Sequence, residues 1–398
     1  MINIAIVGFG TVGSGVAEII KENSAAIAQR LDNEKLNVKY ILDLRDFPGH
    51  ELADRVVHDI NVILNDKDVT IVVETMGGSH PAYEFSKSFL ESGKSVVTSN
   101  KEVVATFGAD LMRIARENEV SYLFEASVGG GIPIIRPMWQ CLAANKIVSV
   151  TGILNGTCNY ILTKMETQKQ SLEQALSVAQ SLGYAEANPA ADIEGTDTLR
   201  KISILSSLAY GKHIQAQNIE CSGIVGITYE DIQAAKSMGY RIKLLGRYED
   251  KGDGTVYAIT APHLVSYDNP LSSINDVYNG ICVKGNMVED VMFCGRGAGK
   301  LPTASAVMAD VLDIIRDCKK TIGWQECNQN LVCDIKTHLT SYYVRTVACE
   351  NDIAQIFPEA QINNIGNENV FITPLMKQSE LDEKIKKLDK AFTIRVLQ

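Results

Sequence analysis

The sequence predicts an α/β protein whose first part is built on a parallel β-sheet. Residues 2–8 form a short and almost continuous apolar run, which is typical of a strand buried on both faces. Residues 8–13 follow at once and read G-x-G-x-x-G. Val16, Ile19 and Ile20 then recur at helical spacing. Strand, glycine pattern and helix in direct succession make up the dinucleotide fingerprint of a Rossmann domain.

The glycines of this fingerprint have separate roles. Gly8 permits a tight turn, Gly10 lets the backbone approach a pyrophosphate, and Gly13 lets the helix pack closely on the strand. The pyrophosphate then lies at the helix N-terminus, where free N–H groups and the helix dipole favour an anion. The predicted cofactor loop consists of Gly8, Phe9, Gly10, Thr11, Val12 and Gly13.

The second predicted strand, residues 38–46, offers two candidates for the ribose of the cofactor. Asp43 could bind the ribose hydroxyls, although it follows the glycines by about thirty residues rather than the ~20 of the usual pattern. Arg45 could instead bind a 2′-phosphate, which favours NADP and leaves dual use with NAD open. Both residues could also be solvated charges at a strand end.

A further buried strand is predicted over residues 69–78 and ends in a glycine turn. Ligands bind at the carboxyl ends of strands in such sheets, so Glu74, Thr75 and Gly77 are candidates to line the nicotinamide side of the site. The next short strand ends beside Lys101, which could polarise a carbonyl or move a proton. A single lysine at such a place is more often a surface charge.

A second glycine-rich segment, residues 124–135, is predicted to begin as a strand and to resume as a helix after Gly129, Gly130 and Gly131. Backbone carbonyls at the glycines and the Glu125 carboxylate could hold a cation that prefers oxygen ligands. A flexible connection between domains explains the same glycines equally well.

The pattern changes after residue 147. A strand over 147–155 is followed by two helices, the second over 171–183, and strand-like segments near 254–261 and 288–294 predict an antiparallel sheet. This arrangement indicates a separate α+β substrate domain. A third glycine turn, at 295–299, leads into an apolar helix that is expected to return to the first domain.

The tail contains predicted strands and helices in the order of a ferredoxin-like unit, strand-helix-strand-strand-helix-strand. The expected domains are therefore a Rossmann domain over 1–130, completed by about 296–325, an α+β domain over 131–295, and a small domain over 338–398.

The stretch from Asp192 to Leu205 combines ionisable residues with the start of an apolar helix. Thr196 is the expected N-cap, and Asp197 in the first turn suits the positive end of the helix. Asp197 and Lys201 are four residues apart, so both project from one face. Four apolar residues can bury the opposite side: Ile202, Ile204, Leu205 and Leu208.

Taken alone, such an i,i+4 pair is usually a solvated surface ion pair. Glu186, Asp192 and Glu194 lie within a dozen residues upstream, in a segment bent by Gly183 and Pro189. Packing does not account for this density of acids. The sequence therefore predicts a polar pocket for a small charged substrate.

Composition limits the function classes. The net charge of −10 without a long basic stripe argues against nucleic acid as the main partner. No apolar segment approaches a membrane span, and the N-terminus lacks the pattern of a signal peptide, so we expect a cytoplasmic protein. Nine cysteines without C-x-x-C spacing predict reduced thiols, and six histidines never spaced i,i+4 give no zinc signature.

Seven segments in one order carry a family resemblance over residues 1 to about 325. They are G-F-G-T-V-G-S-G-V, S-N-K-E, E-A-S-V-G-G-G-I-P-I-I, G-I-L-N-G-T-C-N-Y-I-L, L-G-Y-A-E-A-N-P, D-I-E-G-T-D-T-L-R-K and G-R-G-A-G. With them the chain resembles the homoserine dehydrogenases. The resemblance implies reversible NAD(P)-dependent reduction of L-aspartate 4-semialdehyde to L-homoserine, toward threonine and methionine. It also implies a homodimer, or a homotetramer, formed through the second domain.

The resemblance also implies roles for individual residues. Lys201 matches the acid/base that exchanges a proton with the substrate oxygen, and Lys101 matches the second lysine of the site. The implied substrate ligands are Glu186, Asp197, Asp192 and Gly183. The implied monovalent cation (Na⁺ or K⁺) site is Glu125, Val128, Gly130 and Ile132. A further implied contact near substrate and cofactor is Gly297 or Gly299.

The tail resembles the regulatory ACT domain that bacterial members append. It departs from the family pattern, because the turn that usually reads D-x-P-G-x-L is E-N-D-I-A-Q at 350–355, without proline or glycine. The tail is also short. These departures argue against amino-acid feedback through the usual loop.

The sequence also bears on two other function classes. An acylating semialdehyde dehydrogenase needs a nucleophilic cysteine, for which Cys158 is the candidate, but no histidine lies near it in the sequence. A non-catalytic NADP sensor would keep the glycine fingerprint without the lysines and acids of 183–201. The presence of those residues favours the enzyme.

Overall fold

The structure is a computed structural model that describes residues 1–317 and 322–398, and its contacts divide the chain into two compact units. The first unit contains residues 1–145, 204–215 and the described part of 295–328, and the second contains 146–203, 216–294 and 329–398. Residues 318–321, inside the segment expected to complete the Rossmann domain, lie outside the description. The boundary between the units lies at 145/146, later in the chain than the expected domain boundary at 130/131. Residues 338–398, which were expected to form a separate domain, fall within the second unit.

A six-stranded parallel sheet forms the centre of the first unit, in the order β3-β2-β1-β4-β5-β6. The strands are β1 (Ile2–Val7), β2 (Leu36–Leu42), β3 (Val56–Val57), β4 (Val69–Glu74), β5 (Ser95–Thr98) and β6 (Tyr122–Leu123). Most residues of β1 and β4 and all of β5 are buried, as their largely apolar sequences predicted. This strand order confirms the predicted Rossmann fold.

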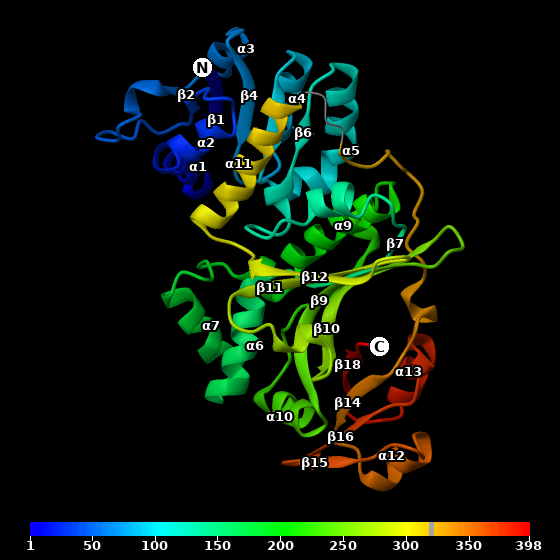
Figure 1. Cartoon of the computed structure of the whole chain (residues 1–398). Coiled ribbons are helices and arrows are strands. Elements are labelled where there is room, and N and C mark those ends of the chain that lie inside the picture. Colours follow the sequence, from blue (N-terminus) through cyan, green and yellow to red (C-terminus); the bar gives the residue numbers. More distant parts are fainter. Residues whose placement is uncertain (318–321) are drawn as a thin grey trace. The chain divides into compact units, whose positions relative to one another are not determined.

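Helices connect these strands in the first unit. They are α1 (Thr11–Glu22), α2 (Ser24–Gln29), α3 (Ile60–Leu64), α4 (Ala82–Glu91), α5 (Lys101–Glu117) and α11 (Lys300–Arg316). The late helix α11 lies beside α1, as Figure 1 shows. A methyl group at Gly15 of α1 would lie 3.1 Å from the Cβ atom of Ala304, so glycine lets the two helices approach closely.

Two expected boundaries in the first unit were wrong. β6 ends at Leu123, so residue 124 does not begin a strand, and Glu125 opens a short 3₁₀ turn (Glu125–Ser127) instead. Lys101 is the first residue of α5, where the Asn100 side chain caps the helix by accepting the N–H groups of Glu102 and Val103. Lys101 therefore lies at a helix start and not at the end of a strand.

A ten-stranded sheet forms the centre of the second unit, in the order β12-β11-β7-β9-β10-β18-β14-β16-β15, with β8 beside β10. Its strands are β7 (Ile147–Ile153), β8 (Glu220–Cys221), β9 (Tyr240–Asp250), β10 (Val256–Ser266), β11 (Tyr278–Gly285), β12 (Glu289–Arg296), β14 (Tyr342–Thr346), β15 (Asn363–Ile365), β16 (Glu368–Ile372) and β18 (Phe392–Val396). A separate two-stranded pair joins β13 (Leu339–Thr340) to β17 (Met376–Lys377).

The helices of the second unit cover this sheet. They are α6 (Gly156–Gln168), α7 (Leu172–Ser181), α8 (Ala190–Ile193), α9 (Thr196–Tyr210, whose residues from Ile204 onward count with the first unit), α10 (Tyr229–Ser237), α12 (Glu350–Ile356) and α13 (Gln378–Ile385). The core of this unit joins α6, α7 and α10 to the sheet through residues such as Ile161, Met165, Ala179, Ile232 and Leu244.

The tail has the expected strand-helix-strand-strand-helix-strand order, with its main strands arranged β18-β14-β16-β15. Its helices α12 and α13 cover a small core that includes Ile353, Phe357, Phe371 and Leu381. β18 also pairs in parallel with β10, so the tail sheet continues the larger sheet of this unit (Figure 1). In the described part of the chain, every helix is too short or too polar to cross a membrane.

Candidate functional site

The centre of the candidate site is the pair Lys201 and Asp197 near the start of α9. Lys201 is only 8% exposed, and its Nζ donates to Asp197 Oδ2 at 2.8 Å and to the Leu154 carbonyl at 2.8 Å. The predicted i,i+4 pair is therefore a buried pair, not a solvated one. No third partner for Nζ is present among the described residues, so one of its three N–H donors is available to a substrate oxygen.

Asn155 joins this pair to a second acid. Its Nδ2 donates to Asp197 Oδ2 at 2.9 Å and to Asp192 Oδ1 at 2.7 Å. Its Oδ1 accepts the backbone N–H of Cys158 at 2.8 Å, which makes Asn155 the N-cap of α6. Sequence reasoning missed this residue, although an asparagine just before a predicted helix is a capping signal.

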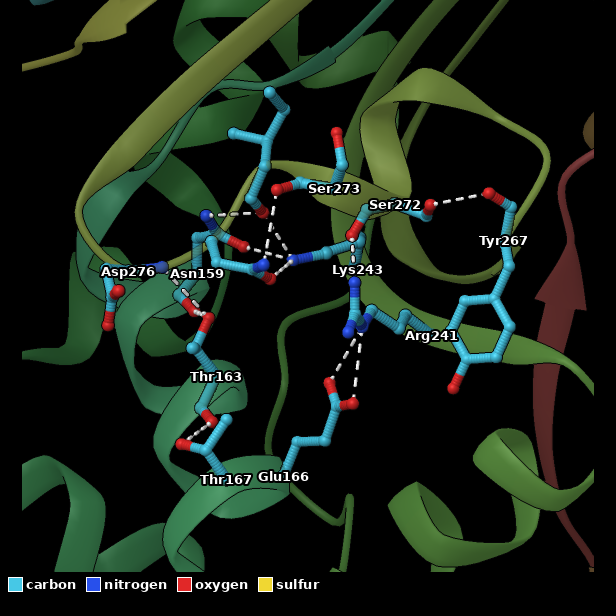
Figure 2. Close-up of polar contacts among 12 residues, drawn as sticks. Asn159, Thr163, Glu166, Thr167, Arg241, Lys243, Tyr267, Ser272, Ser273 and Asp276 are labelled. Carbon is cyan, nitrogen blue, oxygen red and sulfur yellow. Dashed lines mark hydrogen bonds and ion pairs between the residues drawn. The ribbon is translucent and has the colours of Figure 1, made fainter.

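A polar network holds α6, whose N-cap is part of the site, against the segment 272–278 (Figure 2). Lys243 of β9 is 2% exposed, and its Nζ donates to Asn159 Oδ1, the Ile274 carbonyl and Asn275 Oδ1. Asn159 in turn donates to the carbonyls of Ile274 and Tyr278. The start of α6 is thus fixed by hydrogen bonds on two sides.

More hydrogen bonds extend this network along α6 (Figure 2). Thr163 Oγ1 accepts the backbone N–H of Asp276 at 3.1 Å. Arg241 pairs with Glu166 at 3.0 Å and donates to the Ser272 carbonyl at 3.0 Å. These contacts make the helix and the segment beside it one rigid support for Asn155.

The other predicted substrate residues lie differently. Glu186 is exposed, and its carboxylate makes no hydrogen bond with the Lys201 cluster. Gly183 follows the C-cap of α7 with a φ of +74°, and a methyl group there would meet no atom within 4 Å. Thr196 is the first residue of α9, so the predicted N-cap is wrong, and Gly195, with a φ of +90°, occupies the preceding position.

Cys158 is fully buried under the same cluster. Its Sγ donates to the Asp192 carbonyl at 3.1 Å. Burial, reinforced by the charges of Asp192 and Asp197, raises the pKa of this thiol well above its usual value. A thiol that is enclosed and protonated is a poor nucleophile, which argues against an acylating dehydrogenase.

The cofactor loop of the first unit has the geometry that the fingerprint requires. Gly8 has a φ of +88°, and a methyl group at Gly13 would lie 2.1 Å from the Gly8 carbonyl oxygen. A methyl group at Gly10 would meet no atom within 4 Å, so the backbone there is open to a ligand. Thr75 Oγ1 donates to the Gly8 carbonyl at 2.6 Å and fixes the loop from β4. These residues fit a pyrophosphate at the start of α1.

The three non-glycine residues of the loop differ in burial. Phe9 is buried, with its ring 5.2 Å from that of Phe47, whereas Thr11 is exposed at the start of α1 and Val12 is partly buried. The backbone N–H of Phe9 donates to Asp43 Oδ2 at 2.7 Å.

Asp43 and Arg45 form a pair at the end of β2. The Arg45 guanidinium donates to both carboxylate oxygens of Asp43 at 2.9 Å. The hydrogen bonds from Arg45 are the main reason that the pKa of Asp43 falls to about 2. The two candidate ribose contacts are thus one unit, in which the arginine is exposed and the acid is not.

Two candidates for the nicotinamide side are placed by the ends of β4 and β5. Glu74 is 1% exposed and its carboxyl group accepts from Thr98 Oγ1 and from the Met76 N–H, so it is a buried structural group and cannot line a cofactor pocket. Burial raises its pKa to about 7. Gly77 has open space around it. Asn100 Nδ2 donates to the Gly78 carbonyl at 2.7 Å, which connects this turn to the start of α5.

The predicted cation residues lie in a buried turn after β6. The Glu125 carboxylate accepts the backbone N–H groups of Ile134, Ile135 and Arg136, at 2.6 to 2.9 Å. Val128 and Ile132 are 1% exposed. Among the described residues, no group of three or more His, Cys, Asp or Glu side chains could hold a metal ion. A cation here would therefore rely on backbone carbonyls, which suits a hard monovalent ion.

The glycines of this turn contact the third glycine turn. A methyl group at Gly130, where φ is +56°, would lie 2.3 Å from the Gly297 carbonyl oxygen. The Gly131 N–H donates to the Arg296 carbonyl at 3.1 Å. Gly299, with a φ of +122°, precedes α11. The two glycine turns therefore form one closely packed backbone feature in the first unit.

Two family models match the chain and cover most of both units. The model described as the homoserine dehydrogenase NAD-binding domain matches residues 8–125, and the homoserine dehydrogenase model matches residues 133–312. The homoserine dehydrogenase of Bacillus subtilis is 37% identical over 397 residues, which is 96% of this chain and 90% of the relative. The chain belongs to the homoserine dehydrogenase family. The enzyme of Neisseria gonorrhoeae is 35% identical over 393 residues, with 96% and 89% covered.

Solved structures agree with this family assignment. A homoserine dehydrogenase from Thiobacillus denitrificans has a TM-score of 0.89 at 31% identity, with 100% of this chain and 98% of that chain covered. A hyperthermophilic archaeal homoserine dehydrogenase mutant in complex with NADPH has a TM-score of 0.67 at 31% identity, with 78% and 97% covered. Homoserine dehydrogenases form homoserine with NAD(P)H as the hydride donor, so this chain is an oxidoreductase that uses a nicotinamide cofactor.

Proposed function

We propose that Lys201 is the residue that exchanges a proton with the substrate oxygen in the reversible reduction of L-aspartate 4-semialdehyde to L-homoserine. The supporting observation is the state of its ammonium group. Asp197 and the Leu154 carbonyl take two N–H donors and leave one for the substrate. As negative charge develops on the substrate oxygen, a cation beside it stabilises that charge and then supplies the proton.

The lysine and the substrate would be held in position relative to each other by Asp197, Asp192 and Asn155. Asn155 binds both acids, so the carboxylate that pairs with Lys201 cannot rotate away. Asp192 would offer its carboxylate to the substrate ammonium group. Glu186 and Gly183 would bind the same end of the substrate, and Lys101 would act as the second lysine. Fixed positions of this kind supply much of the advantage of an enzyme over solution.

The nicotinamide cofactor would be held by the loop 8–13, with Thr75, Lys101, Gly297 and Gly299 as further contacts. When bound, it supplies or accepts the hydride. Arg45 would favour NADP by pairing with a 2′-phosphate, and it would have to leave Asp43 to do so. The backbone carbonyls of Glu125, Val128, Gly130 and Ile132 would hold a monovalent cation.

We also propose a cellular setting and an assembly for this enzyme. The enzyme would act in the cytoplasm as a homodimer or homotetramer formed through the second unit, in threonine and methionine biosynthesis. Residues 338–398 would be an ACT-like domain, supported by their strand order. Small molecules would be its ligands, without nucleic acid or membrane.

The direct test mixes purified protein with L-homoserine and NADP, and separately NAD, at alkaline pH and follows the absorbance of the reduced nicotinamide. We expect a homoserine-dependent rise, faster with NADP. Folded protein that binds NADP but shows no rise with either cofactor would contradict the proposal.

A further inference from the structure

One face of the second unit carries a cluster of basic and aromatic side chains away from the Lys201 cluster. Arg247 of β9 lies with its guanidinium over the Tyr257 ring of β10, 5.6 Å from the ring centre. His338, at the start of the tail, stacks on the same ring, with 3.8 Å between the ring centres. His263 of β10 pairs in register with Arg395 of β18. Two strands and the tail therefore converge on this cluster.

Several polar groups in the cluster lack a hydrogen-bond partner in the described part of the chain. The Tyr257 hydroxyl is one, in a residue 1% exposed, and His263 Nε2 is another, in a residue with no exposure. The partly buried Arg247 guanidinium has its contact with the Tyr257 ring and no carboxylate or carbonyl acceptor among the described residues. Leaving the donors of a partly desolvated cation unused is unfavourable, and more so than for a neutral group.

The acids near the cluster are already engaged. Glu220 lies 3.3 Å from Arg395, and Glu249 lies 2.9 Å from Lys251. Each of these acids neutralises a cation other than Arg247. The positive charge of Arg247 is therefore the excess charge of the cluster.

The two histidines do not add to this charge. Burial, reinforced by the cationic Arg247, lowers the pKa of His263 well below its usual value and that of His338 to about 4. Both rings are neutral at pH 7. Their contribution is a fixed surface around the Arg247 guanidinium and the Tyr257 hydroxyl.

A surface cleft of about 430 Å³ borders the cluster. Its walls include Glu220, Cys333 and Ile335. Glu220 is the partner of Arg395, and Cys333 and Ile335 pack against the apolar group that contains Tyr257. The cleft therefore brings solvent next to residues that contact the cluster.

We propose that Arg247 and Tyr257 bind a small oxyanion, a carboxylate or a phosphate group, between the β9–β10 face and residues 333–338. A planar guanidinium matches the two oxygens of such a group, and the phenolic hydroxyl adds a third donor. Binding would tie the segment before the tail to the sheet. The site is independent of the dehydrogenase reaction, so its test uses protein without substrate.

The experiment titrates the full-length protein with sodium acetate, sodium phosphate or sodium chloride at equal ionic strength. The melting temperature and the hydrogen exchange of residues 330–342 are followed. Because a ligand that binds only the folded state raises its stability by mass action, we expect acetate or phosphate to raise Tm above chloride and to protect this segment. The more effective anion identifies the ligand class.

Two variants and a control make the test specific. Arg247→Met should weaken anion binding by tenfold or more, because charged hydrogen bonds are the stronger ones. Tyr257→Phe keeps the ring stack and removes one donor, so it should weaken binding by about three- to tenfold. Arg113→Met, at an exposed arginine paired with Glu117, should respond as the natural protein does.

Three results would overturn the proposal. The first is an equal response to all three salts. The second is a full acetate or phosphate response in Arg247→Met, or in Tyr257→Phe if the arginine variant does not fold. The third is no anion response together with a change of molecular mass in solution in Arg247→Met, which would assign this face to contact with a second copy of the chain.

Discussion

Two buried lysines of the second unit differ in how their ammonium groups are satisfied. Lys201 pairs with the Asp197 carboxylate and one carbonyl, and it is 8% exposed. Lys243 is 2% exposed and donates to three neutral oxygens, from Asn159, Ile274 and Asn275. Burial is the main reason that the pKa of Lys243 falls to about 7.

The difference separates a reactive lysine from a structural one. Lys201 forms an ion pair with a carboxylate, and its unused donor lets it act on a substrate. Lys243 has every donor occupied by a neutral oxygen and no carboxylate bonded to it, which suits a residue that holds the segment 272–278 against α6 (Figure 2). Burial alone would have ranked the two residues in the wrong order for function.

Removing the reactive lysine should have the largest effect. We expect Lys201→Ala to lower kcat by about two to four orders of magnitude, the usual contribution of proton transfer by a positioned side chain. The fold should persist, because Asp197 keeps its hydrogen bond to Asn155. Initial rates with L-homoserine measure kcat, and Tm shows whether the fold persists. An unchanged kcat in this variant would contradict the role of Lys201 in proton transfer.

Two variants can separate the two roles of Asn155, which bonds the acids through Nδ2 and caps α6 through Oδ1. Asn155→Ser keeps a capping oxygen but loses the donors to Asp192 and Asp197, so kcat/KM should fall about tenfold or more with stability nearly unchanged. Asn155→Ala should lose a similar factor and also about 1 kcal/mol of unfolding free energy. Steady-state kinetics and urea unfolding of both variants provide the check. An unchanged kcat/KM in the serine variant would show that catalysis does not depend on the hydrogen bonds from Asn155 to Asp192 and Asp197.

Lys243 should make the unfolding free energy depend on pH. The folded protein holds Lys243 at a pKa near 7, below the 10.5 of the unfolded chain, so the unfolded chain binds more protons in between. Stability should therefore rise with pH through this window, by about 1 kcal/mol per unit relative to Lys243→Met. Urea unfolding of both proteins at pH 7, 8 and 9 measures the difference. Parallel pH dependences would refute this description of Lys243.

The outer edge of the same network should matter least. Asp276 pairs with Lys164 at 2.8 Å, but its side chain is 50% exposed. Asp276→Asn keeps the backbone hydrogen bond to Thr163 and should change the unfolding free energy by less than about 0.5 kcal/mol. A loss of several kcal/mol in urea unfolding would mean that the exposed ion pair, and not Lys243, anchors the segment.

Local sequence patterns predicted the features that depend on near neighbours. The fingerprint loop follows from Gly8, Gly10 and Gly13, and the pairing of Asp197 with Lys201 follows from helical spacing. Asn155 escaped prediction because its partners lie 37 and 42 residues away, and only the fold brings them together. The function of Lys243 depends on a contact across 84 residues.

Other expectations failed for reasons of burial and helix geometry. Glu74 ends a strand, where ligands usually bind, but its carboxyl group turns inward to Thr98 and is buried. Thr196 was expected as a helix N-cap and Lys101 at a strand end, but each is the first residue of its helix, after Gly195 and Asn100 respectively. Such boundaries depend on backbone conformation that sequence patterns define only to within a residue or two.

The most direct test of the distinction between the two lysines compares kcat and unfolding free energy for Lys201→Ala and Lys243→Met, prepared and assayed side by side at pH 9. We predict that the first variant loses at least about a hundredfold in kcat, and also some stability because the Asp197 carboxylate and the Leu154 carbonyl lose their donor. The second should lose about 1–3 kcal/mol of stability, from acceptors left without a donor, and little kcat. The reverse pattern, or a loss of kcat in both variants with no loss of stability in either, would contradict the account.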